Sequence, residues 1–79
     1  MTEGTDRDRA FETRVGAQVR SLRKAKHRSQ EWLAEQSDLS PRSVGLLERG
    51  QATVGITTMK RVVGALDMKV WQFFALLDE

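Results

Sequence analysis

The chain has 79 residues, of which 39% are hydrophobic and 30% charged, and its formal net charge is +2. This length supports one domain with a modest core. The lack of cysteine excludes disulfides and thiolate metal sites, and a single histidine cannot form a metal cluster alone. No apolar run approaches the roughly 20 residues of a membrane span, and the first ten residues lack the apolar stretch of a signal peptide. We therefore expect a cytoplasmic protein without metal, cofactor or membrane contact.

Apolar residues in the first third of the chain follow a helical period. They recur at steps of four, four and three, as on one face of a helix: Phe11, Val15, Val19 and Leu22. This stripe predicts a helix over about residues 7–26. The polar residues before it are expected to fray. We therefore predict that residues 1–10 form a flexible extension and that residues 11–79 form the folded domain.

Two short helices follow, separated by a tight turn. Ser29 is expected to cap the first of them, over about residues 30–37, by accepting a hydrogen bond from a free amide at its start. The second is expected to begin with Ser40 as its cap and Pro41 in the first helical position, where a missing N–H group is harmless. It should end at Gly50, which readily adopts the left-handed conformation that closes helices.

Two further apolar stripes at helical spacing predict a fourth and a fifth helix. Their members are Met59, Val62, Val63 and Leu66 for the fourth, and Val70, Phe73, Phe74 and Leu77 for the fifth. No alternating run of β-branched residues supports a strand. The sequence therefore predicts an all-α fold, a compact bundle of five helices around one core.

The segment from residue 30 to residue 50 has the form of a unit that places a helix in the major groove of DNA. Its inward positions are apolar: Leu33, Ala34, Leu39, Val44 and Leu47. The outward positions of its second helix are Pro41, Arg42, Ser43, Gly45, Leu46 and Arg49. In this interpretation Arg42 donates two parallel hydrogen bonds to a guanine, and the N-terminal amides of both helices bind phosphates. The alternative is a pair of ordinary bundle helices that share the pattern by chance.

Basic residues are concentrated in the middle of the chain. Residues 13–61 hold ten Lys or Arg and four Asp or Glu, whereas residues 1–12 and 62–79 each have two more acidic than basic side chains. A polyanion bound by the middle of the chain explains this asymmetry, and so does a charge-rich, solvated helical surface. No nucleophile with a base, paired carboxylates or glycine-rich phosphate loop is visible, so we expect no enzymatic activity.

Residues 19–50, VRSLRKAKHRSQEWLAEQSDLSPRSVGLLERG, resemble the phage-repressor/Cro-type (XRE-like) helix-turn-helix family. The matching elements are an arginine late in the first helix, a Ser-Gln pair, a Leu-Ala pair and a closing Glu-Arg-Gly: Arg23, Ser29-Gln30, Leu33-Ala34 and Glu48-Arg49-Gly50. The similarity continues to Leu66. It implies a lambda-repressor-like DNA-binding domain whose second and third helices form the helix-turn-helix.

The resemblance assigns roles to individual residues. Arg23 and Glu48 match a pair that usually forms a partly buried salt bridge between the first and third helices. The positions that match DNA-contacting residues of the family are Gln30, Pro41, Arg42, Ser43, Leu46, Arg49, Gln51 and Thr53.

Several positions depart from the family pattern. His27 stands where a glycine usually closes the first helix, and Asp38 replaces a frequent glycine of the turn. Two positions that often carry base-reading polar side chains hold apolar residues instead, Pro41 and Leu46. Base recognition is therefore expected to depend mainly on Arg42 and Ser43, with Leu46 against a thymine methyl group.

A narrower resemblance links the chain to the controller proteins of restriction–modification systems. It rests on Ser37-Asp38-Leu39 in the turn, Val44-Gly45 before Leu47-Glu48-Arg49, and Phe73-Phe74 followed by Leu76-Leu77. It implies a homodimer that binds a double-stranded operator with two half-sites, activates or represses its own operon, and contacts RNA polymerase. Small prophage repressors share much of this pattern, as do antitoxins, which also bind a protein partner. An adaptor that keeps the fold without binding DNA is a third alternative.

The aromatic residues allow both a core and a contact interpretation. Phe74 fits the apolar stripe of the last helix, whereas Trp71 lies off it and would be exposed in a monomer. Because large exposed apolar surface usually marks a contact, the expected dimer interface consists of Trp71, Phe74 and Leu77. Trp32 is expected to cover Phe11, with stacking on DNA as the alternative.

Overall fold

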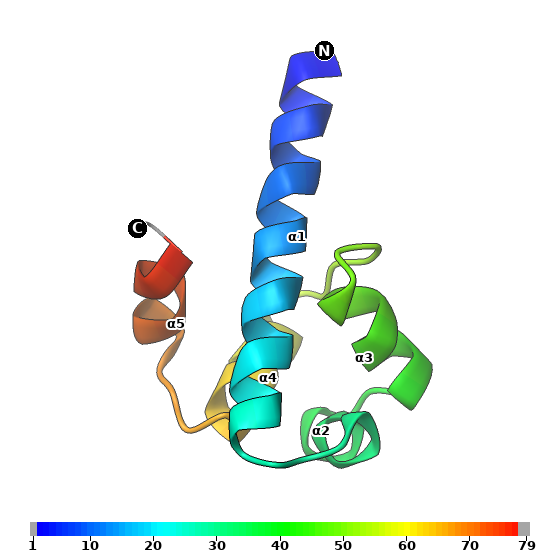
Figure 1. Ribbon diagram of the computed structural model, residues 1–79, viewed down its shortest axis with the longest axis vertical. Helices are drawn as coiled ribbons and strands as arrows, with labels where there is room; N and C mark the ends of the chain where they lie inside the picture. Colours follow the sequence, from blue (N-terminus) through cyan, green and yellow to red (C-terminus); the bar gives the residue numbers. More distant parts are fainter. Residues whose placement is uncertain (1, 78–79) are drawn as a thin grey trace.

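The computed structural model describes the backbone of residues 2–77 and the side chains of residues 8–77. Over this range the chain forms five helices and no strand: α1 (Thr2–Ala25), α2 (Gln30–Ser37), α3 (Pro41–Glu48), α4 (Ile56–Ala65) and α5 (Val70–Leu77). Figure 1 shows α1 as a long central helix, with α5 on one side of it and the α2–α3 pair on the other. The predicted all-α fold of five helices is confirmed.

The first helix begins earlier than its apolar stripe predicted. α1 starts at Thr2 rather than near Arg7, and its N-terminal half projects beyond the other four helices (Figure 1). Residues 2–10 therefore continue α1, whereas residue 1 lies outside the described part of the chain. That this extension is flexible stays a prediction.

The two short helices begin at the predicted caps. Ser29 Oγ accepts a hydrogen bond from the backbone N–H of Trp32 at 3.0 Å, and Ser40 Oγ accepts one from Ser43 at 3.1 Å. Pro41 occupies the first turn of α3. Both hydroxyls satisfy amides that have no partner within their own helix. The starts of α2 and α3 are therefore fixed by local sequence.

Several helices end at residues in the left-handed conformation. Gly50, just beyond α3, has a φ of 71°, as predicted. Three other such positions carry side chains, with φ between 57° and 62°: His27 after α1, Asp38 after α2 and Asp67 after α4. Asp and His adopt this conformation more readily than most residues. Asp67 also forms an ion pair with Lys26, which joins the ends of α4 and α1.

The core lies where the five helices meet. Its fully buried apolar side chains come from every helix: Val19, Leu33, Val44, Val62, Val63 and Phe73. α1 and α3 approach each other closely at Gly16, where an added Cβ would lie 2.2 Å from the carbonyl oxygen of Leu47. Because only glycine fits at this contact, Gly16 sets the distance between α1 and the C-terminal end of α3.

One buried polar group in this core has no partner. Ser37 is fully buried at the end of α2, and its Oγ forms no hydrogen bond with any residue that the structure describes. A buried hydroxyl without a partner destabilises the folded state by about 1–3 kcal/mol. We expect Ser37→Ala to raise the free energy of unfolding by about 1 kcal/mol in urea denaturation.

The control for this substitution is Ser21→Ala on the exposed surface of α1, which changes helix propensity alone. A gain no larger than that of Ser21→Ala, or a loss of stability, would show that the Ser37 hydroxyl is satisfied in solution.

Candidate nucleic-acid interface

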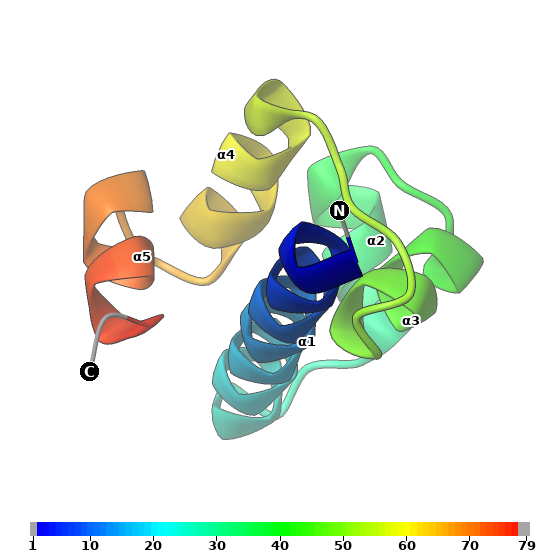
Figure 2. The same cartoon turned by 90° about the horizontal axis from the view of Figure 1, so that it is seen from above.

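α2 and α3 form a rigid two-helix unit. Its inner side chains are buried as predicted: Leu33, Ala34, Val44 and Leu47. The turn is closed by two backbone hydrogen bonds, from the N–H groups of Asp38 and Leu39 to the carbonyl oxygen of Ala34. Figure 2 shows α3 at the edge of the molecule that lies away from α5. The outer face of α3 therefore lies at the surface of the molecule.

The outer face of α3 carries four of the residues predicted to contact DNA, three in its first turn and Leu46 in its second. Pro41 and Arg42 are exposed, whereas Ser43 and Leu46 are half-buried. Arg42 forms no ion pair with any residue in the described part of the chain, so its guanidinium can donate to a base edge. Ser43 Oγ accepts a hydrogen bond from the Ser40 hydroxyl at 3.0 Å and keeps its own proton to donate. The first turn of α3 can therefore present one long and one short hydrogen-bond donor side by side, Arg42 and Ser43.

Arg23 and Glu48 form the ion pair that joins α1 to α3. The guanidinium donates two hydrogen bonds to the carboxylate, from Nε at 2.7 Å and from Nη2 at 2.9 Å. Its third nitrogen donates to the backbone carbonyl of Arg28 at 2.7 Å. The side chains are 9% and 1% exposed. A buried pair with this bidentate geometry leaves a costly unpaired charge if either partner is removed.

Gln30 belongs to the same network, a contact that the sequence analysis missed. Its amide Nε2 donates to Glu48 Oε1 at 3.0 Å. Burial by itself raises the pKa of Glu48, but the hydrogen bonds from Arg23 and Gln30, with the charges of Arg23 and Arg20, together lower it below its ordinary value. The Glu48 carboxylate is therefore ionised, and it holds the Gln30 side chain at the start of α2.

The remaining predicted DNA contacts divide between two places. Gln30, Arg49 and Gln51 line one polar depression beside α1, and Arg49 Nε donates to Gln51 Oε1 at 3.2 Å. The Arg49 guanidinium also covers Gly45, which is buried rather than outward as predicted. Thr53 instead lines an apolar pocket. The structure thus groups the first three with α3 and sets Thr53 apart.

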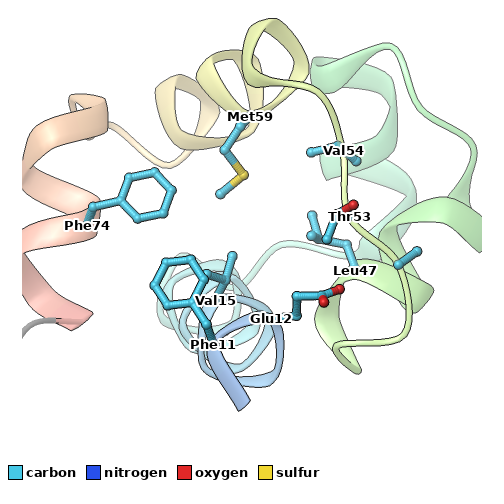
Figure 3. A pocket seen from close by; sticks show the side chains of 9 residues that line it. Phe11, Glu12, Val15, Leu47, Thr53, Val54, Met59 and Phe74 are labelled. Atoms are coloured by element: carbon cyan, nitrogen blue, oxygen red, sulfur yellow. The ribbon is translucent and has the colours of Figure 1, made fainter. Parts of the chain in front are cut away.

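That apolar pocket lies between α1, the loop after α3, α4 and α5. Its volume is about 130 Å³, and its lining includes Phe11, Val15, Leu47, Val54, Met59 and Phe74 (Figure 3). Phe11 stacks on Phe74, with ring centroids 6.2 Å apart and 14° between the ring planes. Phe11 is therefore placed against α5 and not beneath Trp32 as predicted. Trp32 instead contacts Arg28, whose Cζ lies 4.9 Å from the ring centroid.

The three residues predicted for the dimer interface differ in exposure. Trp71 is 67% exposed, Phe74 is half-buried, and Leu77 is only 6% exposed because it packs in the core. Phe74 meets Phe73 edge-on, with centroids 5.2 Å apart. Leu76, which was not predicted, is 43% exposed on the same helix. Within one protomer, the free apolar surface of α5 is therefore centred on Trp71.

The helix-turn-helix formed by α2 and α3 identifies the class of protein, and the sequence agrees. The chain belongs to the HTH_3 helix-turn-helix family, whose sequence model matches residues 19–70. It is a DNA-binding transcriptional regulator in fold and family. No helix in the described range combines the length and apolar character needed to cross a membrane.

Solved structures of three regulators are similar to this chain. The restriction-modification controller protein C.AhdI from Aeromonas hydrophila is 38% identical with a TM-score of 0.78, over 82% of this chain and 98% of that one. The clp gene regulator ClgR from Corynebacterium glutamicum is 33% identical with a TM-score of 0.77, over 81% and 68%. An HTH_3 family transcriptional regulator from Vibrio cholerae is 28% identical with a TM-score of 0.76, over 86% and 38%. No curated protein sequence matches the chain.

Proposed function

We propose that this protein is the controller of a restriction–modification system, which binds a two-half-site operator as a homodimer and regulates its own operon. The observation that carries this proposal is the likeness to C.AhdI, which extends over 98% of that controller's length. In this role the protein acts in the cytoplasm, where the operator lies, and activation would involve a contact with RNA polymerase.

Recognition of the operator is assigned to the outer face of α3. Arg42 reads a guanine edge in the major groove, Ser43 donates to a neighbouring base or phosphate, and Leu46 contacts a thymine methyl group. Gln30, Arg49 and Gln51 bind the sugar–phosphate backbone beside it. We assign Thr53 a more distant contact with the DNA backbone, because this residue lines the apolar pocket.

The proposal is tested by gel shift with the DNA upstream of the protein's own gene at two salt concentrations. Binding should weaken steeply at the higher salt, because phosphate contacts release counterions. The second candidate function is a small prophage repressor or an antitoxin that binds both DNA and a protein partner, since the helix-turn-helix pattern within the matched residues 19–70 is also typical of these regulators. Co-purification of a small toxic partner would favour the antitoxin. No shift at low salt would favour an adaptor that does not bind DNA.

Arg42→Ala should weaken binding to the operator by about 1–3 kcal/mol and leave binding to random DNA almost unchanged. The reason is that a bidentate contact to guanine exists at the specific site alone. The measurement is a pair of equilibrium titrations, one with operator and one with random duplex. Arg61→Ala, an exposed arginine of α4, is the control of equal charge. Equal losses on both duplexes for Arg42→Ala would show that Arg42 contacts only phosphate.

A further inference from the structure

The DNA-facing side of the molecule continues from the helix-turn-helix onto α1. A polar depression of about 600 Å³ is lined by residues of α1 together with residues predicted to contact DNA: Thr13, Ala17, Arg20, Gln30, Glu48, Arg49 and Gln51. A second depression, of about 360 Å³, adjoins it at Gln51 and is lined by Arg9, Glu12 and Gly50. α1 therefore contributes two arginines to this side, about 16 Å apart along the helix.

Two glycines bring α1 to this position. An added Cβ at Gly16 would lie 2.2 Å from the carbonyl oxygen of Leu47, and one at Gly50 would lie 2.6 Å from the Cα of Thr13. The backbone of α1 therefore packs closely against the rest of the chain at two places, at the end of α3 and in the loop after it. This double contact fixes the exposed face of α1 beside Arg49 and leaves no room for it to rotate away.

The electrostatics of these depressions favour an anion. Arg9, Arg20 and Arg49 are all exposed. Of the two acids in the lining, Glu48 is already neutralised by its bidentate pair with Arg23, which leaves Glu12 as the one unpaired acid among the lining residues. Arg20 forms no ion pair with any described side chain. The Thr13 hydroxyl donates to the Arg9 carbonyl at 2.9 Å, so its proton is used in a hydrogen bond within α1.

We propose that α1 is a second DNA-backbone contact, in which Arg20 and Arg9 each bind a phosphate that flanks the half-site read by α3. This inference rests on the proposed DNA-binding function and adds two binding residues to it. Because about 16 Å separates the two arginines along α1, they bind different phosphates. The contacts carry no sequence information and position the recognition helix in its groove.

The experiment uses three matched substitutions in the full chain: Arg9→Gln, Arg20→Gln and, as the control, Arg14→Gln. Arg14 belongs to the same helix but lines a depression with Leu76 and Leu77 of α5, away from α3. The probes are a duplex of about 30 base pairs selected by the wild-type protein from a random pool, and a random duplex of equal length. Affinity for both is measured between about 50 and 200 mM salt. Sedimentation checks that all variants keep the wild-type assembly.

We expect Arg9→Gln and Arg20→Gln each to reduce the slope of log K against log salt by about 0.9 per protomer, hence by about 1.8 for a bound dimer, and the double substitution by about twice that. Each should lower the affinity for both duplexes by the same factor, and Arg14→Gln should change neither affinity nor slope. Arg20→Lys should restore the slope, which separates a charge contact from a disturbance of the nearby Glu48 network. A slope for both glutamine variants equal to that of Arg14→Gln would overturn the α1 contact while leaving the DNA-binding proposal intact. Failure of the wild-type protein to bind any duplex at low salt would instead overturn the DNA-binding function and this inference with it.

Discussion

Glu48→Ala is expected to unfold the domain, or to lower its free energy of unfolding by about 3–5 kcal/mol. The substitution strands the guanidinium of Arg23, which is 7% exposed and donates two of its three hydrogen bonds to this carboxylate. It also removes the acceptor of the Gln30 amide. α1 would lose its ion pair with α3, so the main effect of the substitution should be a lower free energy of unfolding and not the loss of an individual DNA contact.

Thermal and urea denaturation of Glu48→Ala measure this effect. Glu35→Ala is the matched control, because Glu35 is an exposed acid of α2 outside the network. A melting temperature within about a degree of wild type would mean that the pair contributes little, since a loss of 1 kcal/mol alone shifts the midpoint of a domain this size by about 4–8 °C.

The pH dependence of stability gives a second measure of the same pair. The folded-state pKa of Glu48 is lowered from its ordinary value of 4.5. The stabilisation is therefore fully present above that ordinary value and is lost as the pH falls through it toward the folded-state pKa. We expect wild-type stability to decline in this acid range, and the decline to be smaller in Glu48→Gln, which has no carboxyl group to protonate at this site.

Trp71→Glu is expected to dissociate the proposed homodimer and to reduce affinity for a two-half-site operator by about 10²–10⁴-fold. Trp71 is 67% exposed in the protomer, and burying a carboxylate in an apolar interface is costly unless the charge is paired. Two half-sites held by one dimer bind cooperatively through their high effective concentration. A monomer loses that gain and binds one half-site at a time.

Sedimentation and operator titration report the two parts of this result separately. Ile56→Glu is the control for assembly, because Ile56 is 82% exposed at the start of α4 and lies off α5. It introduces the same charge in place of an exposed apolar side chain, and the dimer should survive it. A monodisperse dimer of Trp71→Glu would remove Trp71 from the interface and leave Leu76 as the next candidate on α5.

The sequence predicted the features of the fold that depend on neighbouring residues. The serine caps at 29 and 40 act within three residues, so they could be located without tertiary information. The helical stripes predicted α4 and α5 for the same reason. The start of α1 was placed too late, because the stripe reports only the part of a helix that packs and the N-terminal half projects beyond the bundle.

Contacts between distant segments could not be predicted in the same way. Phe11 stacks on Phe74 because α1 passes beside α5, and nothing local in either segment encodes that neighbour. Gln30 bonds to Glu48 because α2 begins next to the end of α3. On α5, the stripe placed Leu77 on the apolar face, but it could not show that this residue packs in the core of one protomer and not at a dimer interface.

The two tryptophans lie in different environments, so their fluorescence can report on assembly and on DNA binding separately. Trp32 lies beneath the Arg28 guanidinium at the start of α2, whereas Trp71 is largely in water on α5. Emission from Trp71 should shift to shorter wavelength when protomers associate, because its ring leaves water. Emission from Trp32 should change when DNA binds at Gln30, the proposed backbone contact two residues away on α2. Single-tryptophan variants, Trp32→Phe and Trp71→Phe, would therefore allow assembly and operator binding to be followed as separate optical signals on the same unlabelled chain.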